Sequence, residues 1–228
     1  MSEKIILKIS MLTGLFILSI MGYFSFTQAS DVPVGFEIKK ILRQAPHINP
    51  EALKVGLKAY YCAVQAGQVD NPLLTIIDYS KPSTEKRFYV VDVESNHVKF
   101  DTLAAHGQGS GDNYATQFSD SPSSHQSSIG VFKTGSTYQG SHGESLRLHG
   151  LEHGYNAHAL SRAVVIHGAP YVSETFAQRM GRLGRSWGCP ALSTDIIKPV
   201  IRAIKEGSLV VAYYPNKRWL QSSKYLNC

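Results

Sequence analysis

Residues 184–190 read Gly-Arg-Ser-Trp-Gly-Cys-Pro, and residues 166–168 read Ile-His-Gly at the end of a strand-like apolar run. The first stretch places Cys189 in a glycine-flanked turn, where its sulfur and nearby backbone N–H groups can face one substrate carbonyl. The second places His167 at the end of a buried strand. A thiolate needs a base to form near neutral pH, and donors to receive the oxyanion it creates. The two stretches therefore predict a cysteine nucleophile with a histidine base.

Both residues also have a purely structural interpretation. Free cysteines are among the most buried residue types, and a strand-end histidine is often a satisfied core residue. Gly188 favours a functional Cys189 because glycine lets the backbone approach closely, and Pro190 stiffens the chain that follows. Residues 168–170 (Gly-Ala-Pro) break the strand, which places His167 at the rim of a sheet. No helix face can hold both residues, so only the fold can bring them together.

The chain has three cysteines, Cys62, Cys189 and Cys228. In an oxidising compartment two of them tend to pair, and Cys189 has the surroundings of a reactive thiol. Cys62 falls on the last turn of an expected helix, and Cys228 is the final residue of the sequence. We therefore expect a disulfide between Cys62 and Cys228. The alternative is a small core residue at position 62 and a frayed tail.

Residues 1–29 have the pattern of an export signal. Lys4 and Lys8 precede an apolar run over 11–26, and residues 27–29 (Thr-Gln-Ala) resemble a small-residue cleavage site. The apolar run is short for a membrane span, so we expect a cleaved signal and no permanent span. The exported protein then belongs in the periplasm or cell-wall space. We expect a linker over 30–48 and one catalytic domain over 49–228, acting as a monomer.

The apolar spacing predicts a helix over 49–67, with Pro50 near its start and Gly67 just past its end. Further helices are expected over 173–183 and 194–205. Short β-branched and aromatic runs predict strands over 73–79, 87–93, 98–105, 129–133, 145–151, 163–167 and 208–214. The fold class that follows is mainly β (α+β).

Residues 106–128 form a long segment rich in Gly, Ser, Asp and Asn. Segments of this length in a compact domain tend to be functional. We expect this one to border the site as a lid, with Tyr114 and Phe118 packing over a ligand.

Charge and histidine spacing exclude other classes of function. The net charge of +6 suits an anionic environment such as a cell wall, or merely ordinary solubility. We find no lysine–arginine run and no nucleic-acid motif, so nucleic acid is not an expected partner. The histidines match neither a helical HExxH nor a zinc-finger spacing, so we expect no metal site. Some of them are expected to line a polar cleft instead.

The quoted residues resemble a known family. His167-Gly168 followed by residues 186–189 (Ser-Trp-Gly-Cys) is similar to the His-Gly and Ser-His-Gly-Cys signature of YkuD-type L,D-transpeptidases. Residues 124–128, 145–148 and 184–192 resemble the murein L,D-transpeptidase catalytic domain branch, and the resemblance extends over 52–228. It implies a YkuD-like β-sandwich or barrel with a few flanking helices, and no metal or organic cofactor.

The resemblance also implies roles for individual residues. Cys189 would be the acylated nucleophile and His167 its base, oriented by a backbone carbonyl such as that of Gly168. Gly188 and Cys189 would contribute oxyanion-hole N–H groups, and Ser186 would shape the turn. The expected substrate-binding residues are Arg185, Trp187, Gly168, His125 and Tyr171.

Two positions depart from the family's pattern. Trp187 stands where the family at large has histidine, which implies that a second imidazole is not essential at this position. Ala191 stands where a polar or basic residue is common, and Arg185 is the candidate for a compensating contact with a substrate carboxylate.

The implied activity is peptidoglycan L,D-transpeptidation, in which a thioester with a tetrapeptide stem is passed to an amine acceptor to give a 3→3 cross-link. Transfer to water would make the protein an L,D-carboxypeptidase or another cysteine hydrolase of wall peptides. The remaining alternatives are a non-catalytic wall-binding protein that uses the same cleft and a histidine-rich metal binder.

Overall fold

The computed structural model describes residues 34–228. The expected signal over 1–29 lies outside this range. The described chain forms one eight-stranded mixed sheet flanked by helices, in the order β3-β2-β1-β8-β4-β5-β6-β7. This confirms the expected α+β class. The strands are β1 (Leu73–Asp78), β2 (Phe88–Asp92), β3 (His97–Thr102), β4 (Gly130–Gly140), β5 (Gly143–Gly150), β6 (Val165–Gly168), β7 (Ala191–Leu192) and β8 (Leu209–Tyr213).

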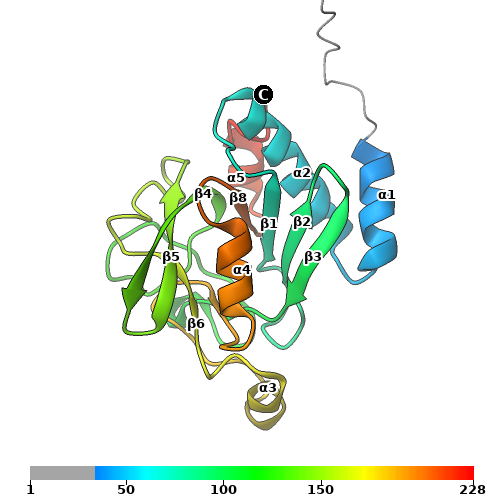
Figure 1. Cartoon of the computed structure of the whole chain (residues 1–228). Coiled ribbons are helices and arrows are strands. Elements are labelled where there is room, and N and C mark those ends of the chain that lie inside the picture. The colour runs from blue at the N-terminus through cyan, green and yellow to red at the C-terminus, as the bar shows by residue number, and fades with distance from the viewer. Residues whose placement is uncertain (1–33) are drawn as a thin grey trace, which may run out of the picture. The chain divides into compact units, whose positions relative to one another are not determined.

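The helices of the described chain flank this sheet (Figure 1). They are α1 (Val34–Gln44), α2 (Pro50–Gln65), α3 (Glu174–Met180), α4 (Ile197–Ile204) and α5 (Lys217–Ser222), with a 3₁₀ turn at η1 (Gln108–Ser110). Within residues 34–228, no helix has both the length and the apolar content to cross a membrane.

The two edges of the sheet approach each other. Most neighbouring strands are antiparallel, while β1 pairs with β8 and β6 with β7 in parallel. Ala105, just beyond β3, forms an isolated bridge with Ala191 of β7. The bridge nearly closes the sheet into a barrel-like form and places β7, which begins two residues after Cys189, inside the fold.

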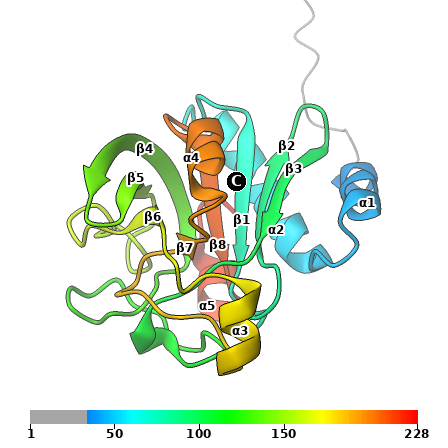
Figure 2. The same ribbon diagram turned by 60° about the horizontal axis from the view of Figure 1, so that its bottom comes forward.

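The core has a layer on each face of the central strands. All six residues of β1 are buried, and because strand side chains alternate, Leu74 and Ile76 enter one layer while Leu73 and Ile77 enter the other. Helix α2 packs in the first layer and α4 in the second, on opposite faces of the sheet (Figure 2). This two-sided burial is why β1 reads as a continuous apolar run instead of an alternating one.

Helix α2 agrees with the helix expected over 49–67. Asn49 is its N-cap, with the side chain accepting from the Glu51 N–H, and Gly67 follows the helix with φ +65°. Cys62 lies on its last turn and forms a disulfide with Cys228, as expected. The bridge ties the C-terminal end of the sequence to α2.

Helix α1 lies within the range 30–48, where we expected a linker. Its Ile41 is fully buried, and buried Glu37 accepts a hydrogen bond of 2.6 Å from the Tyr61 hydroxyl of α2. The apolar residues of the segment recur at helical spacing, which lets one face pack against α2 and β3. The segment is therefore an ordered part of the domain instead of a plain connection.

The largest difference from the expected strands is the β4–β5 hairpin. Strand β4 was expected to end at position 133 and runs to Gly140, with a register shift between Thr134 and Thr137. Residues 135–140 (Gly-Ser-Thr-Tyr-Gln-Gly) carry little apolar pattern because this part of the hairpin projects from the core. The hairpin tip is consequently free to reach the neighbouring site.

Candidate active site

The pairing of β6 with β7 brings the two predicted reactive residues together. His167 of β6 is in register with Ala191 of β7, two residues after Cys189. Both Cys189 and His167 line a single cleft of about 570 Å³. Parallel pairing of two short strands thus joins groups that are distant in sequence.

Ser186 organises the turn that carries Cys189. Its Oγ donates to the Cys189 carbonyl at 2.6 Å and accepts from the Gly188 N–H at 3.1 Å. Gly188 has φ +122°, and a Cβ there would lie 2.8 Å from the Gln126 carbonyl oxygen, so both backbone angle and space require glycine. We expected the Gly188 N–H to be an oxyanion donor, but Ser186 occupies it. The Cys189 N–H makes no hydrogen bond within residues 34–228 and stays available.

His167 is buried and fixed in one tautomer. Its Nδ1 lies 3.0 Å from the Gly168 carbonyl oxygen, which can only accept, so Nδ1 carries the proton and Nε2 has the free lone pair. Burial lowers the pKa of His167; the hydrogen bond to Gly168 opposes this, and nearby His142 adds to it. The ring is therefore held as the neutral base that proton abstraction requires.

Cys189 is held as a thiol. Its Sγ accepts from the Val165 N–H at 3.4 Å and donates to the Ala163 carbonyl at 3.6 Å, and it makes no hydrogen bond with His167 in the described chain. Burial raises the pKa of Cys189, while the Val165 N–H and the charge of Arg162 lower it. Thiol and imidazole are thus both neutral at rest, and the thiol must turn toward His167 to lose its proton.

Among residues 34–228, those that line the cleft offer cations, imidazoles and aromatic rings, and none is a carboxylate. Its lining comes from the tip of the β4–β5 hairpin, from the segment 162–167, and from the turn around Cys189. The lining residues are Tyr138, Ser141, His142, Arg162, Ala163, Val165, His167, Tyr171, Arg185, Ser186, Trp187 and Cys189.

Three of the five expected substrate-binding residues line the cleft. Trp187 is 75 % exposed at its edge, and Tyr171 packs against Gly184. Arg185 also lines it, although its Nη1 donates to the Gly111 carbonyl at 3.0 Å and lies 3.3 Å from the Asp112 carboxylate.

The other two lie outside the cleft lining. Gly168 is buried and reaches the site only through the carbonyl that orients His167. His125 stacks on Trp187, with ring centroids 5.0 Å apart, and lies 3.0 Å from the side-chain nitrogen of Gln108. His125 can therefore affect the cleft only through its contact with the Trp187 indole.

The segment 106–128 is not the lid that its composition predicted. None of its residues lines the cleft, and half-buried Phe118 packs between Tyr79 and Tyr214 against the core. Its Gly and Ser residues serve close backbone packing: a Cβ at Gly107 would lie 2.7 Å from the Gly188 Cα. The hairpin tip covers the site instead, and the His142 ring stacks on His167 with centroids 4.5 Å apart.

Sequence reasoning missed Arg162 and the hairpin residues Tyr138 and Ser141, and it named His142 only within a group of histidines. Arg162 stands five positions before His167 in an unremarkable polar stretch, and nothing in its spacing marks it. Within residues 34–228, no group of three or more His, Cys, Asp or Glu side chains could hold a metal ion.

A family model described as the L,D-transpeptidase catalytic domain matches residues 44–213. The chain belongs to this family, which acts on peptidoglycan. Solved structures that are similar include "L,D-transpeptidase from Mycobacterium smegmatis" (14 % identity, TM-score 0.37) and "Structure of LD transpeptidase LdtMt1 in complex with imipenem" (16 % identity, TM-score 0.36). Each match covers 62 % of this chain and 67 % of the other. No curated protein matches the sequence significantly.

Proposed function

We propose that the protein is a peptidoglycan L,D-transpeptidase that uses Cys189 as its nucleophile and His167 as its base. One observation carries the proposal: His167 Nδ1 is committed to the Gly168 carbonyl, so Nε2 is the ring's proton acceptor in a cleft that Cys189 also lines. A neutral imidazole and a half-buried thiol that line one cleft are a combination that general-base nucleophilic catalysis needs.

Acylation begins when Cys189 Sγ passes its proton to His167 Nε2 and bonds to the carbonyl carbon of the third, diamino-acid residue of a tetrapeptide stem. The Cys189 N–H donates to the oxyanion of the tetrahedral intermediate, a contact typically worth about 10²–10³ in rate. The bond from that carbon to the nitrogen of terminal D-alanine then breaks. The imidazolium returns its proton to this nitrogen, leaving a thioester.

Transfer reverses these roles. An amine of a second stem attacks the thioester and gives its proton to His167 Nε2, the C–S bond breaks, and the sulfur regains a proton. The product is a 3→3 cross-link. When water replaces the amine, the product is a trimmed tripeptide stem. All groups that move protons belong to the chain, so the proposed reaction uses no cofactor.

The charge of the cleft supports a peptide substrate rich in carboxylates. Arg162 and Arg185 line it, and no Asp or Glu of residues 34–228 does. Tyr138, Tyr171 and Trp187 offer apolar surface. Stem peptides carry several carboxylates on a short backbone, which such a surface attracts. The Cys62–Cys228 disulfide supports the oxidising, extracytoplasmic location that we propose, in the periplasm or cell-wall space.

Incubation of peptidoglycan with residues 30–228 tests the proposal. We expect mass analysis of digested material to show tetrapeptide–tripeptide dimers with 3→3 links, and D-alanine to be released. The control is Cys189→Ala, which should do neither. Trimmed stems without dimers would identify a carboxypeptidase. Wall binding unchanged by Cys189→Ala, together with no covalent adduct to a carbapenem, would overturn the enzymatic proposal.

A further inference from the structure

Arg162 is a cation that the protein buries beside the nucleophile. Its side chain is only 5 % exposed, yet it lines the cleft that contains Cys189. Burying a guanidinium is costly unless its N–H groups are satisfied. The hydrogen bonds that satisfy the buried guanidinium therefore show which parts of the chain Arg162 holds in place.

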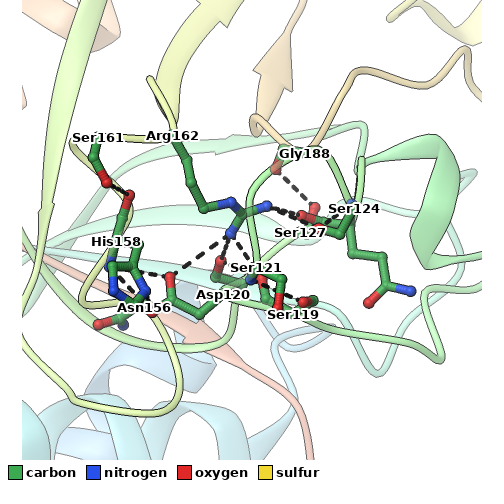
Figure 3. Close-up of polar contacts among 12 residues, drawn as sticks. Ser119, Asp120, Ser121, Ser124, Ser127, Asn156, His158, Ser161, Arg162 and Gly188 are labelled. Carbon is green, nitrogen blue, oxygen red and sulfur yellow. Dashed lines mark hydrogen bonds and ion pairs between the residues drawn. The ribbon is translucent and has the colours of Figure 1, made fainter.

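Four N–H bonds fix the guanidinium. Nη1 donates to the Ser119 carbonyl at 2.7 Å and to Ser128 Oγ at 2.6 Å. Nη2 donates to Ser124 Oγ at 3.2 Å (Figure 3). It also donates to the Gln126 carbonyl at 2.8 Å. All four acceptors belong to the segment 119–128, so one side chain gathers this otherwise irregular segment around itself.

The gathered segment supports the turn that carries Cys189. Ser127 Oγ donates to the Gly188 carbonyl at 3.0 Å (Figure 3). A Cβ on Gly188 would lie 2.8 Å from the Gln126 carbonyl oxygen and 3.6 Å from Arg162 Nη2. The guanidinium therefore lies against the backbone immediately before the nucleophile.

The positive charge of Arg162 is poorly compensated. Its four acceptors are neutral carbonyls and hydroxyls. The nearest carboxylate oxygen, Asp120 Oδ1, is 3.8 Å from Nη1, and Asp120 Oδ2 accepts from His158 Nδ1 at 2.8 Å. Arg162 and His158 thus share one carboxylate. Arg162 and Cys189 line the same cleft, where the positive charge of Arg162 lowers the pKa of the thiol.

We propose that Arg162 is an electrostatic and positioning residue of this site: it holds residues 119–128 against Gly188 and supplies the positive charge in whose field the Cys189 thiolate forms. The inference rests on the proposed function only for its consequence in acyl transfer, because thiolate formation can be measured without a substrate. In this proposal the segment 106–128 supports the turn that carries Cys189 and does not act as a lid over the cleft.

Other ionisable groups also face the cleft. They are His142 from the hairpin, His167 from β6, Arg185 and Tyr171 from the flanking segments, and Tyr138 from β4. None is a carboxylate, and His167 is neutral at rest, as its lowered pKa requires. Arg185 has the Asp112 carboxylate 3.3 Å from its Nη1, so Arg162 is the less compensated of the two arginines.

The test is alkylation of Cys189 by iodoacetamide in the disulfide-intact protein as a function of pH. We expect Arg162→Gln to move the alkylation curve to higher pH and to slow the reaction at pH 7.5 by about tenfold, since an adjacent opposite charge commonly shifts a pKa by at least one unit. Arg162→Lys keeps the charge and should stay near wild type in alkylation. It should still lower kcat for stem peptides, because an ammonium cannot satisfy four fixed acceptors.

Two further variants separate this proposal from simple misfolding. Asp120→Asn removes the shared negative charge and should shift the alkylation curve to lower pH, the opposite direction. Arg182→Gln removes an arginine that pairs with Asp112 outside the cleft and serves as the matched control.

An alkylation curve for folded Arg162→Gln that coincides with wild type overturns the proposal. If circular dichroism shows that Arg162→Gln is unfolded, an unshifted Asp120→Asn curve overturns it. If the wild type transfers no stem peptide while the alkylation curves of the variants shift as expected, the proposed function is wrong and the role of Arg162 stands.

Discussion

Two hydrogen bonds of the Ser186 hydroxyl fix the conformation of the turn that carries Cys189. Ser186 Oγ bonds the Cys189 carbonyl and the Gly188 N–H, so the turn closes on itself, while the Cys189 N–H makes no hydrogen bond within residues 34–228. The sulfur rests between the Val165 N–H and the Ala163 carbonyl. The nucleophile is therefore stored as a thiol and is activated only when a proton can move to His167.

This resting state predicts how Cys189 reacts with pH. The pKa of Cys189 is raised and that of His167 is lowered, so the thiolate–imidazolium pair does not form at neutral pH. We expect iodoacetamide alkylation to rise steadily from pH 6 to 9, as the thiolate fraction increases. His167→Ala should change alkylation by less than about threefold and reduce acyl transfer by about 10⁴, as loss of a general base typically does.

The rate of alkylation against pH, measured beside D-alanine release, checks this expectation. Cys189→Ala identifies any labelling at other sites. A plateau of reactivity extending below pH 6 would mean that an ion pair is already formed, and the neutral resting state would then be wrong.

At the scale of elements, the tip of the β4–β5 hairpin lies at the site, where composition favoured the segment 106–128 as a lid. The polar segment is tied down by Arg162 and by backbone contacts to the turn, including the Gln108 N–H to the Ser186 carbonyl at 2.8 Å. The hairpin tip instead carries His142 onto His167. A second imidazole is thus present at the site, supplied by the β4–β5 hairpin.

The stacked imidazole predicts a shift of the acid limb of activity. His142 lowers the pKa of His167 and its ring covers the base, so His142→Ala should raise that pKa. Because only neutral His167 accepts a proton, activity is lost as pH falls through its pKa, and the loss should start at higher pH in the variant. We expect kcat/KM at pH 6 to fall severalfold, with little change at pH 8.

The pH profile of D-alanine release measures this shift, and the ¹H–¹³C signal of His167 reports its titration directly. Gln139→Ala, at an exposed position of the same hairpin outside the cleft lining, is the matched control. Equal acid limbs for wild type and His142→Ala would show that the stack has no influence on the base.

At the scale of the molecule, the Cys62–Cys228 disulfide links α2 to the far end of the sequence, with a separation of 166 residues. In the chain-entropy model a loop of this length contributes about 5 kcal/mol, an upper figure. We expect the double variant Cys62→Ser with Cys228→Ser to lower Tm by about 10 °C or more.

Thermal unfolding with and without reductant checks the disulfide. Reductant should lower the Tm of the wild type and leave the double variant unchanged. Thiol titration of the denatured, unreduced protein should find one reactive thiol, that of Cys189. Three reactive thiols, or a Tm insensitive to reductant, would contradict the bridge.

The sequence by itself determined the parts that depend on local pattern. Residues 184–190 marked the Cys189 turn because a Gly-Cys-Pro turn has a recognisable backbone requirement, and apolar periodicity located α2 and most strands. The pairing of Cys62 with Cys228 followed from having three cysteines and one reactive environment. These inferences need no knowledge of which segments meet in space.

Only the tertiary structure decided what surrounds the thiol. The register of His167 with Ala191 brings base and nucleophile to one cleft, and the parallel pairing that does so leaves no trace in local sequence. The same holds for Arg162, whose four acceptors lie some 34 to 43 positions away along the chain. Long-range contacts depend on how strands pair and twist, whereas composition reports only local preference. For that reason composition favoured as a lid a polar segment whose residues 119–128 are bonded to Arg162 and lie outside the cleft lining.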